Sequence, residues 1–258
     1  KQRADDINEA FADKSINAIW CVHGGDSANS ILSLLDYELI KKNPKLFLGM
    51  SDIDVLSLAL NKKTGLVGFN TADAKIGRGC YMTFDYSKES FVNRLMKKEK
   101  NIIKNSEWKN VRGGKAKGKI LGCNITSILK LAGTEYWPDF DGAILFLETY
   151  TSAPKKVMFK LEQLKQIGVF DKIKGLVLGH FYSPENKEYL KENPQLDIEG
   201  NPILVEELFL DMLKDYDFPI MKINEIGHVC QNCFLPIGVE LEMDADNLTL
   251  NIVEEFLE

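Results

Sequence analysis

The tetrapeptide Gly49-Met50-Ser51-Asp52 has the residue types of a nucleophile held in a sharp turn. The apolar run 46–48 leads into it, and a helix is expected to follow. Such a turn lifts the serine hydroxyl to the carboxyl edge of a sheet, where the next N–H and the helix dipole can stabilise an oxyanion. The second glycine of the usual Gly-x-Ser-x-Gly pattern is absent, and the tetrapeptide alone favours a helix cap at Ser51 or Asp52. Asp54 is a third cap candidate, which would free Ser51 from that role.

A pair of glycines follows the apolar run 18–22, in the sequence His23-Gly24-Gly25-Asp26. Glycines in this position let the main chain approach a ligand and present N–H groups to an oxyanion or a phosphate. The spacing completes neither a Walker loop nor a dinucleotide-binding fingerprint. An ordinary strand-to-helix turn explains the same residues equally well.

Glu148 ends the apolar run 143–147, which places a carboxylate at the exit of a buried strand. A buried carboxylate is costly without a partner, and a helix cap or a solvent-facing acid is the alternative interpretation. The three histidines, His23, His180 and His228, are the candidates for a general base, because their ordinary pKa lies near neutrality. His180 also follows a buried strand and competes with His228 for this role.

Five cysteines, an odd number, suit a reducing cytosol better than a disulfide framework. Cys230 and Cys233 lie close to His228, and together the three side chains would give zinc three of its four ligands. No second Cys-x-x-Cys is present, and the deaminase signature is incomplete as well. We therefore favour two loop thiols near a functional histidine, with no bound metal.

The elements that position these residues alternate between short apolar strands and amphipathic helices in the first third of the chain. Strands are expected at 18–22, 46–48 and 66–69, and helices at 5–11, 27–40 and 52–60. A further helix is expected at 90–104. Continuous apolar strands that alternate with helices indicate a parallel sheet covered on both faces.

The second half is richer in strands. Strands are expected at 143–147, 175–179 and from 219, helices at 124–132, 155–167 and 204–213, and a hairpin over 239–250. We predict an α/β protein with a parallel-sheet, Rossmann-like domain at 1–80, a linker at 81–110 and a mixed α/β domain at 111–258.

The composition excludes several classes of protein. Of 258 residues, 45% are hydrophobic and 27% charged, as in ordinary globular proteins and unlike disordered chains. The net charge of −6 argues against a nucleic-acid-binding protein. No run of about 18 apolar residues occurs, so no membrane span is expected.

Taken in order, the segments resemble the L,D-carboxypeptidase family of serine peptidases, which includes microcin-immunity hydrolases. The resemblance is carried by these segments: Arg3–Phe11, Gly24–Asn29, Asn43–Lys45, Gly49–Asp52, Gly118–Asn124, Asp141–Glu148, Gly227-His228 and Leu235–Gly238. Two departures are Cys123, where glycine is usual, and Asp54, where threonine is common. The Cys230/Cys233 pair is not part of the pattern.

The resemblance implies a Ser–His–Glu triad between the two domains. Ser51 would be the nucleophile, His228 the general base and later acid, and Glu148 the carboxylate that orients the imidazole. The main-chain N–H groups of Asp52 and Gly25 would form the oxyanion hole. No metal or other cofactor is expected.

The resemblance also implies a substrate class: a murein-derived peptide that loses a terminal D-amino acid. The alternative is a peptidyl or aminoacyl nucleotide, as in immunity-type relatives, which carry a longer aromatic insertion where 101–113 offers only Trp108. Two further alternatives are a binding protein without turnover and a metal-dependent amidase. Lys75, Arg78 and Arg112 are candidates for holding the substrate carboxylate.

The biological setting that the resemblance implies is a cytoplasmic homodimer that acts on a small peptide or peptide-nucleotide, with neither nucleic acid nor membrane as a partner. The chain begins Lys1-Gln2-Arg3, and relatives carry one or two β-α units before this point. We therefore expect the N-terminal domain to continue upstream of Lys1.

Overall fold

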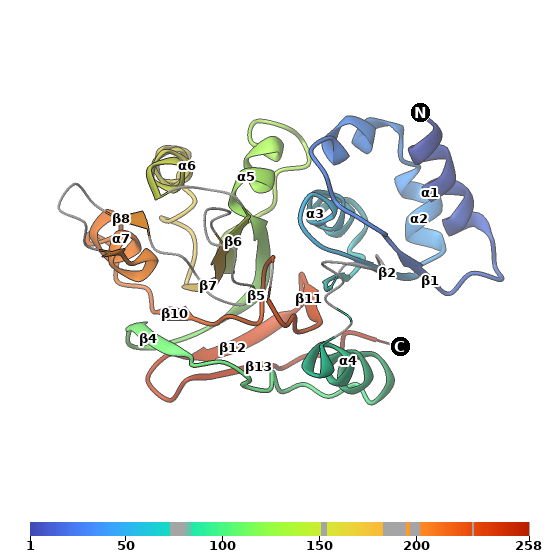
Figure 1. The fold of residues 1–258 in the computed structure, drawn as a ribbon. Helices are drawn as coiled ribbons and strands as arrows, with labels where there is room; N and C mark the ends of the chain where they lie inside the picture. The colour runs from blue at the N-terminus through green and yellow to red at the C-terminus, as the bar shows by residue number, and fades with distance from the viewer. Residues whose placement is uncertain are drawn as a thin grey trace.

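The computed structural model describes residues 1–72, 82, 84–150, 154–182, 195–196, 202–228 and 230–257. Figure 1 shows a smaller unit made from the first elements of the chain beside a larger unit rich in strands. The predicted α/β fold, a parallel sheet followed by a mixed strand-rich part, is confirmed.

The smaller sheet consists of three parallel strands and one antiparallel strand from near the C-terminus, in the order β1-β2-β3-β11. Its strands are β1 (Ala18–Trp20), β2 (Leu46–Gly49), β3 (Gly68–Asn70) and β11 (Leu235–Ile237). Its helices are α1 (Gln2–Ala12), the 3₁₀ helix η1 (Ala28–Leu34), α2 (Tyr37–Lys42) and α3 (Ile53–Thr64). In Figure 1, α3 lies on the side that faces the larger unit, and α1 and α2 lie on the outer side. Phe47 and Leu48 point to opposite faces of β2 and are both buried, as expected for a strand covered on both sides.

The larger sheet has seven strands in the order β13-β12-β5-β6-β7-β10-β4. The strands are β4 (Lys109–Arg112), β5 (Lys115–Asn124), β6 (Ile144–Tyr150), β7 (Gly175–Tyr182), β10 (Ile220–Lys222), β12 (Glu240–Asp244) and β13 (Thr249–Ile252). The four central strands, β5, β6, β7 and β10, run parallel, so their carboxyl ends meet at one edge. The predicted antiparallel hairpin at the C-terminus is β12–β13. A separate ribbon pairs β8 (Gln195–Leu196) with β9 (Pro202–Ile203).

The helices of the larger unit lie in the connection from β3 to β4 and in the connections between the larger unit's strands. They are α4 (Asp85–Phe91), the π-helical turn η3 (Val92–Met96), α5 (Ile125–Ile128), the 3₁₀ turn η4 (Leu129–Leu131), α6 (Pro154–Gln166) and α7 (Val205–Met212). Of these, α5 follows β5 directly and packs against α3 of the smaller unit. The α3–α5 contact brings the two units together next to the carboxyl end of β5.

The single helix expected over 27–40 is wrong, because the structure has η1 and α2 in its place. Leu35 is extended, with ψ of 138°. Asp36 then starts a new helix, since its carboxylate accepts a hydrogen bond from the Leu39 N–H at 2.9 Å. The apolar spacing of the segment is compatible with either arrangement, and the capping aspartate decides between them.

The helix expected over 90–104 is also wrong in its extent. Helical structure starts earlier, at Asp85, and ends at Met96. Lys98 has a positive φ of 56°, which is incompatible with a continuing α-helix. The residues that follow are held by other contacts, such as that of the Ile102 N–H with the Leu250 carbonyl at 3.1 Å.

One hydrophobic core runs through both units. The ring of Trp20 on β1 packs against Phe91 of α4 and Phe234, with centroids 5.8 and 5.9 Å apart. The boundary predicted at residue 80 lies outside the described residues, and the limits at 80 and 110 stay predictions. Within the described part of the chain, no helix is both long and apolar enough to cross a membrane.

Candidate active site

The Ser51 turn connects β2 to α3 in one sharp bend. Ser51 has a positive φ of 63°, a strained conformation for a residue with a side chain. Gly49 is required before it, because a Cβ there would lie 2.4 Å from Ile53 Cγ2 at the start of α3. This strand, strained serine and helix have the geometry of a nucleophile elbow.

Neither acid of this turn caps α3. Asp52 occupies the N-cap position, but its side chain makes no capping hydrogen bond. Its carboxylate is 1% exposed and accepts from the Ala28 N–H at 2.7 Å, while the other oxygen contacts Lys130 Nζ. Asp54 is buried as well and accepts from Asn70 Nδ2 at 2.7 Å. The side chains of Asp52 and Asp54 therefore bind other groups and do not cap α3.

The main chain around Gly24 lies directly against the Ser51 turn. A Cβ on Gly24 would lie 2.9 Å from Ser51 Cβ and 3.1 Å from Asp52 N, so only glycine fits without a shift. Gly25 has φ of 126°, and the space beside its Cα is open. In the part of the chain that is described, the Asp52 N–H has no acceptor, unlike the three N–H groups that follow it. These two segments could therefore donate hydrogen bonds to one oxyanion.

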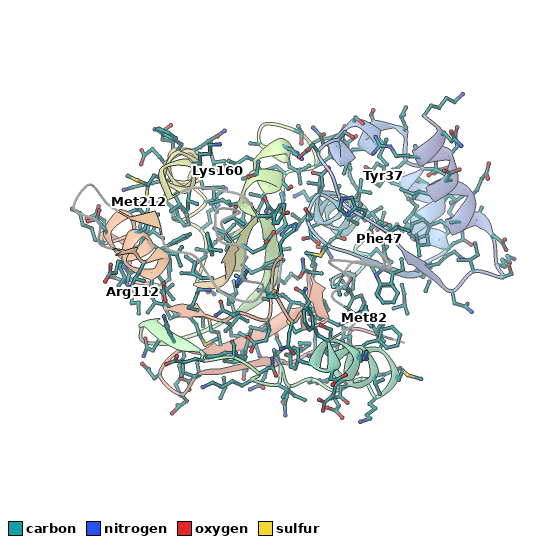
Figure 2. All side chains as sticks on the ribbon, in the orientation of Figure 1. Tyr37, Phe47, Met82, Arg112, Lys160 and Met212 are labelled. Atoms are coloured by element: carbon teal, nitrogen blue, oxygen red, sulfur yellow. The ribbon has the colours of Figure 1, made fainter. Side chains whose placement is uncertain are left out.

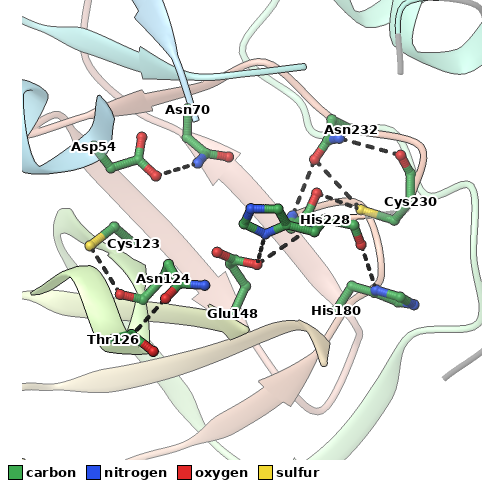
Figure 3. Close-up of polar contacts among 11 residues, drawn as sticks. Asp54, Asn70, Cys123, Asn124, Thr126, Glu148, His180, His228, Cys230 and Asn232 are labelled. Atoms are coloured by element: carbon green, nitrogen blue, oxygen red, sulfur yellow. Dashed lines mark hydrogen bonds and ion pairs between the residues drawn. The ribbon is translucent and has the colours of Figure 1, made fainter. Parts of the chain in front are cut away.

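Glu148 and His228 are in direct contact although 80 residues separate them in the chain. His228 Nδ1 lies 2.7 Å from Glu148 Oε2, and the His228 main-chain N–H donates to the same oxygen at 3.3 Å. Glu148 is 1% exposed, so it is neither a cap nor a solvent-facing acid. Figure 3 shows the pair at the centre of the polar contacts.

The β6–β7 ladder is irregular where Glu148 lies. Register runs from Leu147 opposite Leu178 to Thr149 opposite Phe181, so Glu148 stands opposite two residues of β7, Gly179 and His180. Bulges of this kind re-aim a side chain and are frequent next to active sites. The extra residue lies on β7, so the irregularity falls where Glu148 and His180 are neighbours.

The tautomer of His228 follows from this contact. A carboxylate only accepts hydrogen bonds, so Nδ1 carries the proton and Nε2 of the neutral ring has a free lone pair. The ring also stacks on Tyr150, with centroids 4.8 Å apart and an interplanar angle of 25°. The His228 side chain is 12% exposed, which leaves an edge of the imidazole open to a ligand.

A buried hydrogen bond connects the Ser51 turn to α5, which follows the strand that neighbours Glu148. Asp52 accepts from Ser127 Oγ of α5 at 3.3 Å. The residue that caps α5 is Asn124, and it is the register partner of Glu148 on neighbouring strands. Burial, followed by the negative charges of Asp54, Glu148 and Asp52, raises the pKa of Cys123, so this thiol lies among all three carboxylates.

The Ser51 hydroxyl is not hydrogen-bonded to His228 in this structure. Within the described ranges, Ser51 Oγ has no hydrogen-bond partner. The structure thus brings Glu148 and His228 into contact and shows no hydrogen bond between Ser51 Oγ and either of these two described residues. Catalytic hydrogen bonds are often long without substrate and tighten when it binds.

The other two histidines take different positions. His180, the rival base, is buried on β7, and its Nδ1 lies 2.8 Å from the His228 carbonyl oxygen. His23 is exposed in the loop after β1. His228 is the histidine whose Nδ1 lies 2.7 Å from Glu148 Oε2.

The cysteines form no metal site among the residues that are described, and no group of three or more histidine, cysteine and acidic side chains suits a metal there. Cys230 and Cys233 are free and buried. Burial raises the pKa of Cys233 to about 12 and that of Cys230 well above its usual value. Both are therefore neutral thiols at physiological pH.

The candidates for the substrate carboxylate are not supported by the described residues. Arg112 donates to the main-chain oxygens of Leu213 and Tyr216 at 2.8 and 2.6 Å. Figure 2 shows Arg112 on the side of the molecule that carries Met212, far from Phe47 of β2. Lys75 and Arg78 lie outside the described residues.

Sequence reasoning missed two residues at this site. Tyr150 lies two positions after Glu148 on the same strand, and the period-two rule could have placed both on one face. Lys130 contacts Asp52 from the other unit, and no local pattern reveals that contact.

Two family models match the chain. Residues 1–71 match the LD-carboxypeptidase N-terminal domain, and residues 117–243 match the LD-carboxypeptidase C-terminal domain. Ser51 lies within the first match, and Glu148 and His228 lie within the second.

Curated relatives fall into two groups by name. The microcin C7 self-immunity protein MccF of Escherichia coli is 28% identical over all of this chain and 79% of its own. The probable murein peptide carboxypeptidase of Bacillus subtilis is 27% identical over 96% of this chain and 75% of its own.

Solved structures fall into the same two groups. MccF in complex with aspartyl sulfamoyl adenosine covers the whole chain and is itself covered to 82%, with a TM-score of 0.84 and 26% identity. Muramoyltetrapeptide carboxypeptidase from Oxalobacter formigenes matches 98% of this chain and 83% of its own, with a TM-score of 0.80 and 26% identity.

Proposed function

The chain belongs to the LD-carboxypeptidase family of serine peptidases, and we propose that it hydrolyses an amide bond through Ser51, Glu148 and His228. The observation that carries the proposal is the 2.7 Å contact between a buried glutamate and a histidine whose Nε2 is left as the base. The strained φ of Ser51, just before the N-terminus of α3, supports its role as nucleophile. This arrangement follows the logic of the serine–histidine–acid triad, with Glu in place of Asp.

In the proposed reaction, Ser51 Oγ attacks the scissile carbonyl carbon while His228 Nε2 accepts the hydroxyl proton. The carbonyl oxygen becomes an oxyanion, which accepts hydrogen bonds from the N–H groups of Asp52 and Gly25. When the C–N bond breaks, His228 gives its proton to the leaving amine and an acyl ester remains on Ser51. Water then attacks this ester with His228 as base, which releases the carboxylate and restores the hydroxyl.

We propose a murein-derived peptide as the substrate, from which a terminal D-amino acid is released after an L-centre. The murein and muramoyltetrapeptide carboxypeptidases among the relatives support this choice. Trp108, the one tryptophan of the short 101–113 segment, supports it too, because it is 3% exposed and its Nε1 donates to Glu225 at 2.8 Å. A buried, hydrogen-bonded tryptophan does not offer a face on which a nucleobase can stack.

The second candidate is hydrolysis of an aminoacyl or peptidyl nucleotide. Its support is the MccF structure bound to aspartyl sulfamoyl adenosine, which matches the whole chain. The chemistry at Ser51 would be the same, and the two candidates differ only in the group beyond the acyl donor.

The test offers both substrate classes to the purified protein. Wild type is incubated with a murein tetrapeptide and, separately, with aspartyl sulfamoyl adenosine, and products are identified by mass spectrometry. We expect release of the terminal D-amino acid from the tetrapeptide, none with Ser51→Ala, and wild-type rates with the exposed control Ser15→Ala.

The other outcomes separate the alternatives. Cleavage of the adenylate analogue alone would favour the nucleotide substrate, and binding without cleavage of either would favour a binding protein. Loss of activity in chelator would favour a metal-dependent amidase, whereas the serine mechanism predicts full activity.

A further inference from the structure

His228 follows a strained glycine in the segment Ile226–His228, which is held from both sides by buried groups. Gly227 has φ of 131°, a conformation that L side chains rarely adopt. A Cβ on Gly227 would lie 3.1 Å from both Glu148 Oε2 and the main-chain oxygen of His180. The segment thus passes between Glu148 and His180 in contact with both, and its path determines where the imidazole of His228 lies.

His180 binds the two carbonyls on either side of Gly227. Its main-chain N–H donates to the Ile226 oxygen at 2.6 Å, and its Nδ1 lies 2.8 Å from the His228 oxygen. Because a carbonyl oxygen only accepts hydrogen bonds, Nδ1 of His180 carries a proton and donates it. His180 is 1% exposed on β7, next to the strand that carries Glu148.

Cys230 and Asn232 hold Gly227 itself. The Cys230 thiol donates to the Gly227 oxygen at 3.1 Å, and Asn232 Oδ1 accepts from the Gly227 N–H at 3.1 Å. Burial raises the pKa of Cys230, so the thiol stays protonated and remains a donor. Asn232 is anchored in turn, because its N–H donates to Ser87 Oγ of α4 at 3.0 Å. Figure 3 shows Cys230 and Asn232 beside His228.

Every main-chain polar group from the Ile226 carbonyl to the His228 carbonyl therefore has a partner, with the N–H of His228 bound by Glu148. A loop with all these groups satisfied has few alternative conformations of similar energy. That is the condition a general base requires, since a displacement of about 1 Å costs about 10²-fold in rate.

We propose that His180 is a positioning residue for the reaction and that, with Cys230 and Asn232, it forms a clamp on the main chain of His228. This His228 clamp keeps the imidazole on Glu148 and gives the Cys230 thiol a function that needs neither a metal nor a disulfide. The proposal rests on the proposed function, since it names what holds the base of that reaction. His180 itself acts through His228 and touches no reacting atom.

The first test compares two substitutions that differ in one hydrogen-bond donor. His180→Leu fills similar space without a donor, whereas His180→Asn places an amide N–H on the atom that corresponds to Nδ1. We expect kcat on the murein tetrapeptide to fall about 10²-fold in His180→Leu with little change in KM, and His180→Asn to recover most of it. Equal kcat in His180→Leu and wild type, or equal losses in both variants, would overturn the proposal.

The second test needs no substrate and so separates this proposal from the proposed function. The Nδ1–H proton of His228, hydrogen-bonded to Glu148, should give a downfield proton NMR resonance in wild type and His180→Asn. It should broaden or disappear in His180→Leu, and an unchanged resonance there would overturn the clamp even if no substrate were ever cleaved.

A milder variant covers the case in which His180→Leu does not fold. Cys230→Ala removes the hydrogen bond from the thiol to the Gly227 oxygen without removing a large core side chain. We expect a lower kcat and a broadened His228 resonance at a temperature well below the unfolding transition, and wild-type values of both would contradict the clamp. Ser51→Ala and His228→Ala, assayed in parallel, report on the proposed function alone.

Discussion

The two oxygens of the Glu148 carboxylate differ in their hydrogen bonds. One oxygen receives both donors of His228, whereas Oε1 has no hydrogen-bond partner within the described chain. A buried carboxylate held mainly by one imidazole stabilises the positive charge that forms on that imidazole during proton transfer. At the scale of residues, this asymmetry is the strongest sign that Glu148 has a chemical role.

Glu148→Gln tests the charge while it preserves the shape. The amide oxygen can still accept from Nδ1, but the compensating charge is lost, so we expect kcat to fall about 10³–10⁴-fold with the fold intact. Glu162→Gln, an exposed acid on α6, is the matched control and should retain wild-type kcat. Steady-state kinetics measure kcat for both variants. A Glu148→Gln enzyme that keeps the wild-type kcat would remove Glu148 from the mechanism.

At the scale of elements, the Ser51 turn is fixed by an ion pair between the two units. Asp52 is 1% exposed and contacts Lys130, whose side chain is 19% exposed and which lies in the 3₁₀ turn η4 directly after α5. The position of the neighbouring Ser51 therefore depends on a contact that η4 supplies. This pair explains how a strained serine on the smaller sheet is kept beside the carboxyl edge of the larger one.

Lys130→Met should weaken both stability and activity. It leaves the buried Asp52 carboxylate without its cation, which costs about 3 kcal/mol in free energy of unfolding and lowers kcat because the Ser51 turn loosens. Lys100→Met breaks the exposed pair with Glu255 and should cost less than about 1 kcal/mol. Urea unfolding measures the loss of free energy of unfolding in each variant. Equal small losses in Lys130→Met and Lys100→Met would show that the Asp52–Lys130 pair does not hold the Ser51 turn.

The elements that sequence predicted well are those whose pattern is local. The continuous apolar run 143–147 became most of β6, and the alternation around Met243 and Leu250 became the β12–β13 hairpin. The segment Leu235–Gly238 carries part of the family resemblance, but its pattern does not predict the strand β11, which is three residues long and contains Pro236. Its proline is tolerated because the strand pairs at the edge of the smaller sheet.

The candidate site depended on more than local pattern. Each of the three proposed residues has an ordinary structural explanation by itself, and the sequence joined them only through the family resemblance. The Glu148–His228 contact spans 80 residues, and the Asp52–Lys130 contact spans 78, so no periodicity can reveal either. Such contacts are set by packing of the two sheets, which only the structure supplies.

At the scale of the whole molecule, the two units share a sheet and a core. β11 comes from the last quarter of the chain and completes the smaller sheet by pairing with β3. Ser87 and Ser90 of α4 bind the N–H groups of Asn232 and Phe234 at 3.0 and 2.9 Å, so the predicted linker supports the His228 loop. The units are therefore interlocked and cannot separate without breaking the site.

We expect this interlocking to produce a single unfolding transition. Far-UV circular dichroism reports on both sheets, and tryptophan fluorescence reports on Trp20 in one unit and Trp108 and Trp137 in the other. The two signals should give the same urea midpoint. Separate midpoints would show that residues 1–80 unfold as an independent domain.

The most direct test of the account is whether Ser51 is a nucleophile. The folded protein is treated with a fluorophosphonate probe, and the modified peptide is identified by mass spectrometry. We predict one adduct per chain, on Ser51, with labelling abolished in Ser51→Ala and greatly slowed in His228→Ala and Glu148→Gln. An adduct on another serine, or equal labelling of wild type and Ser51→Ala, would contradict the proposed triad.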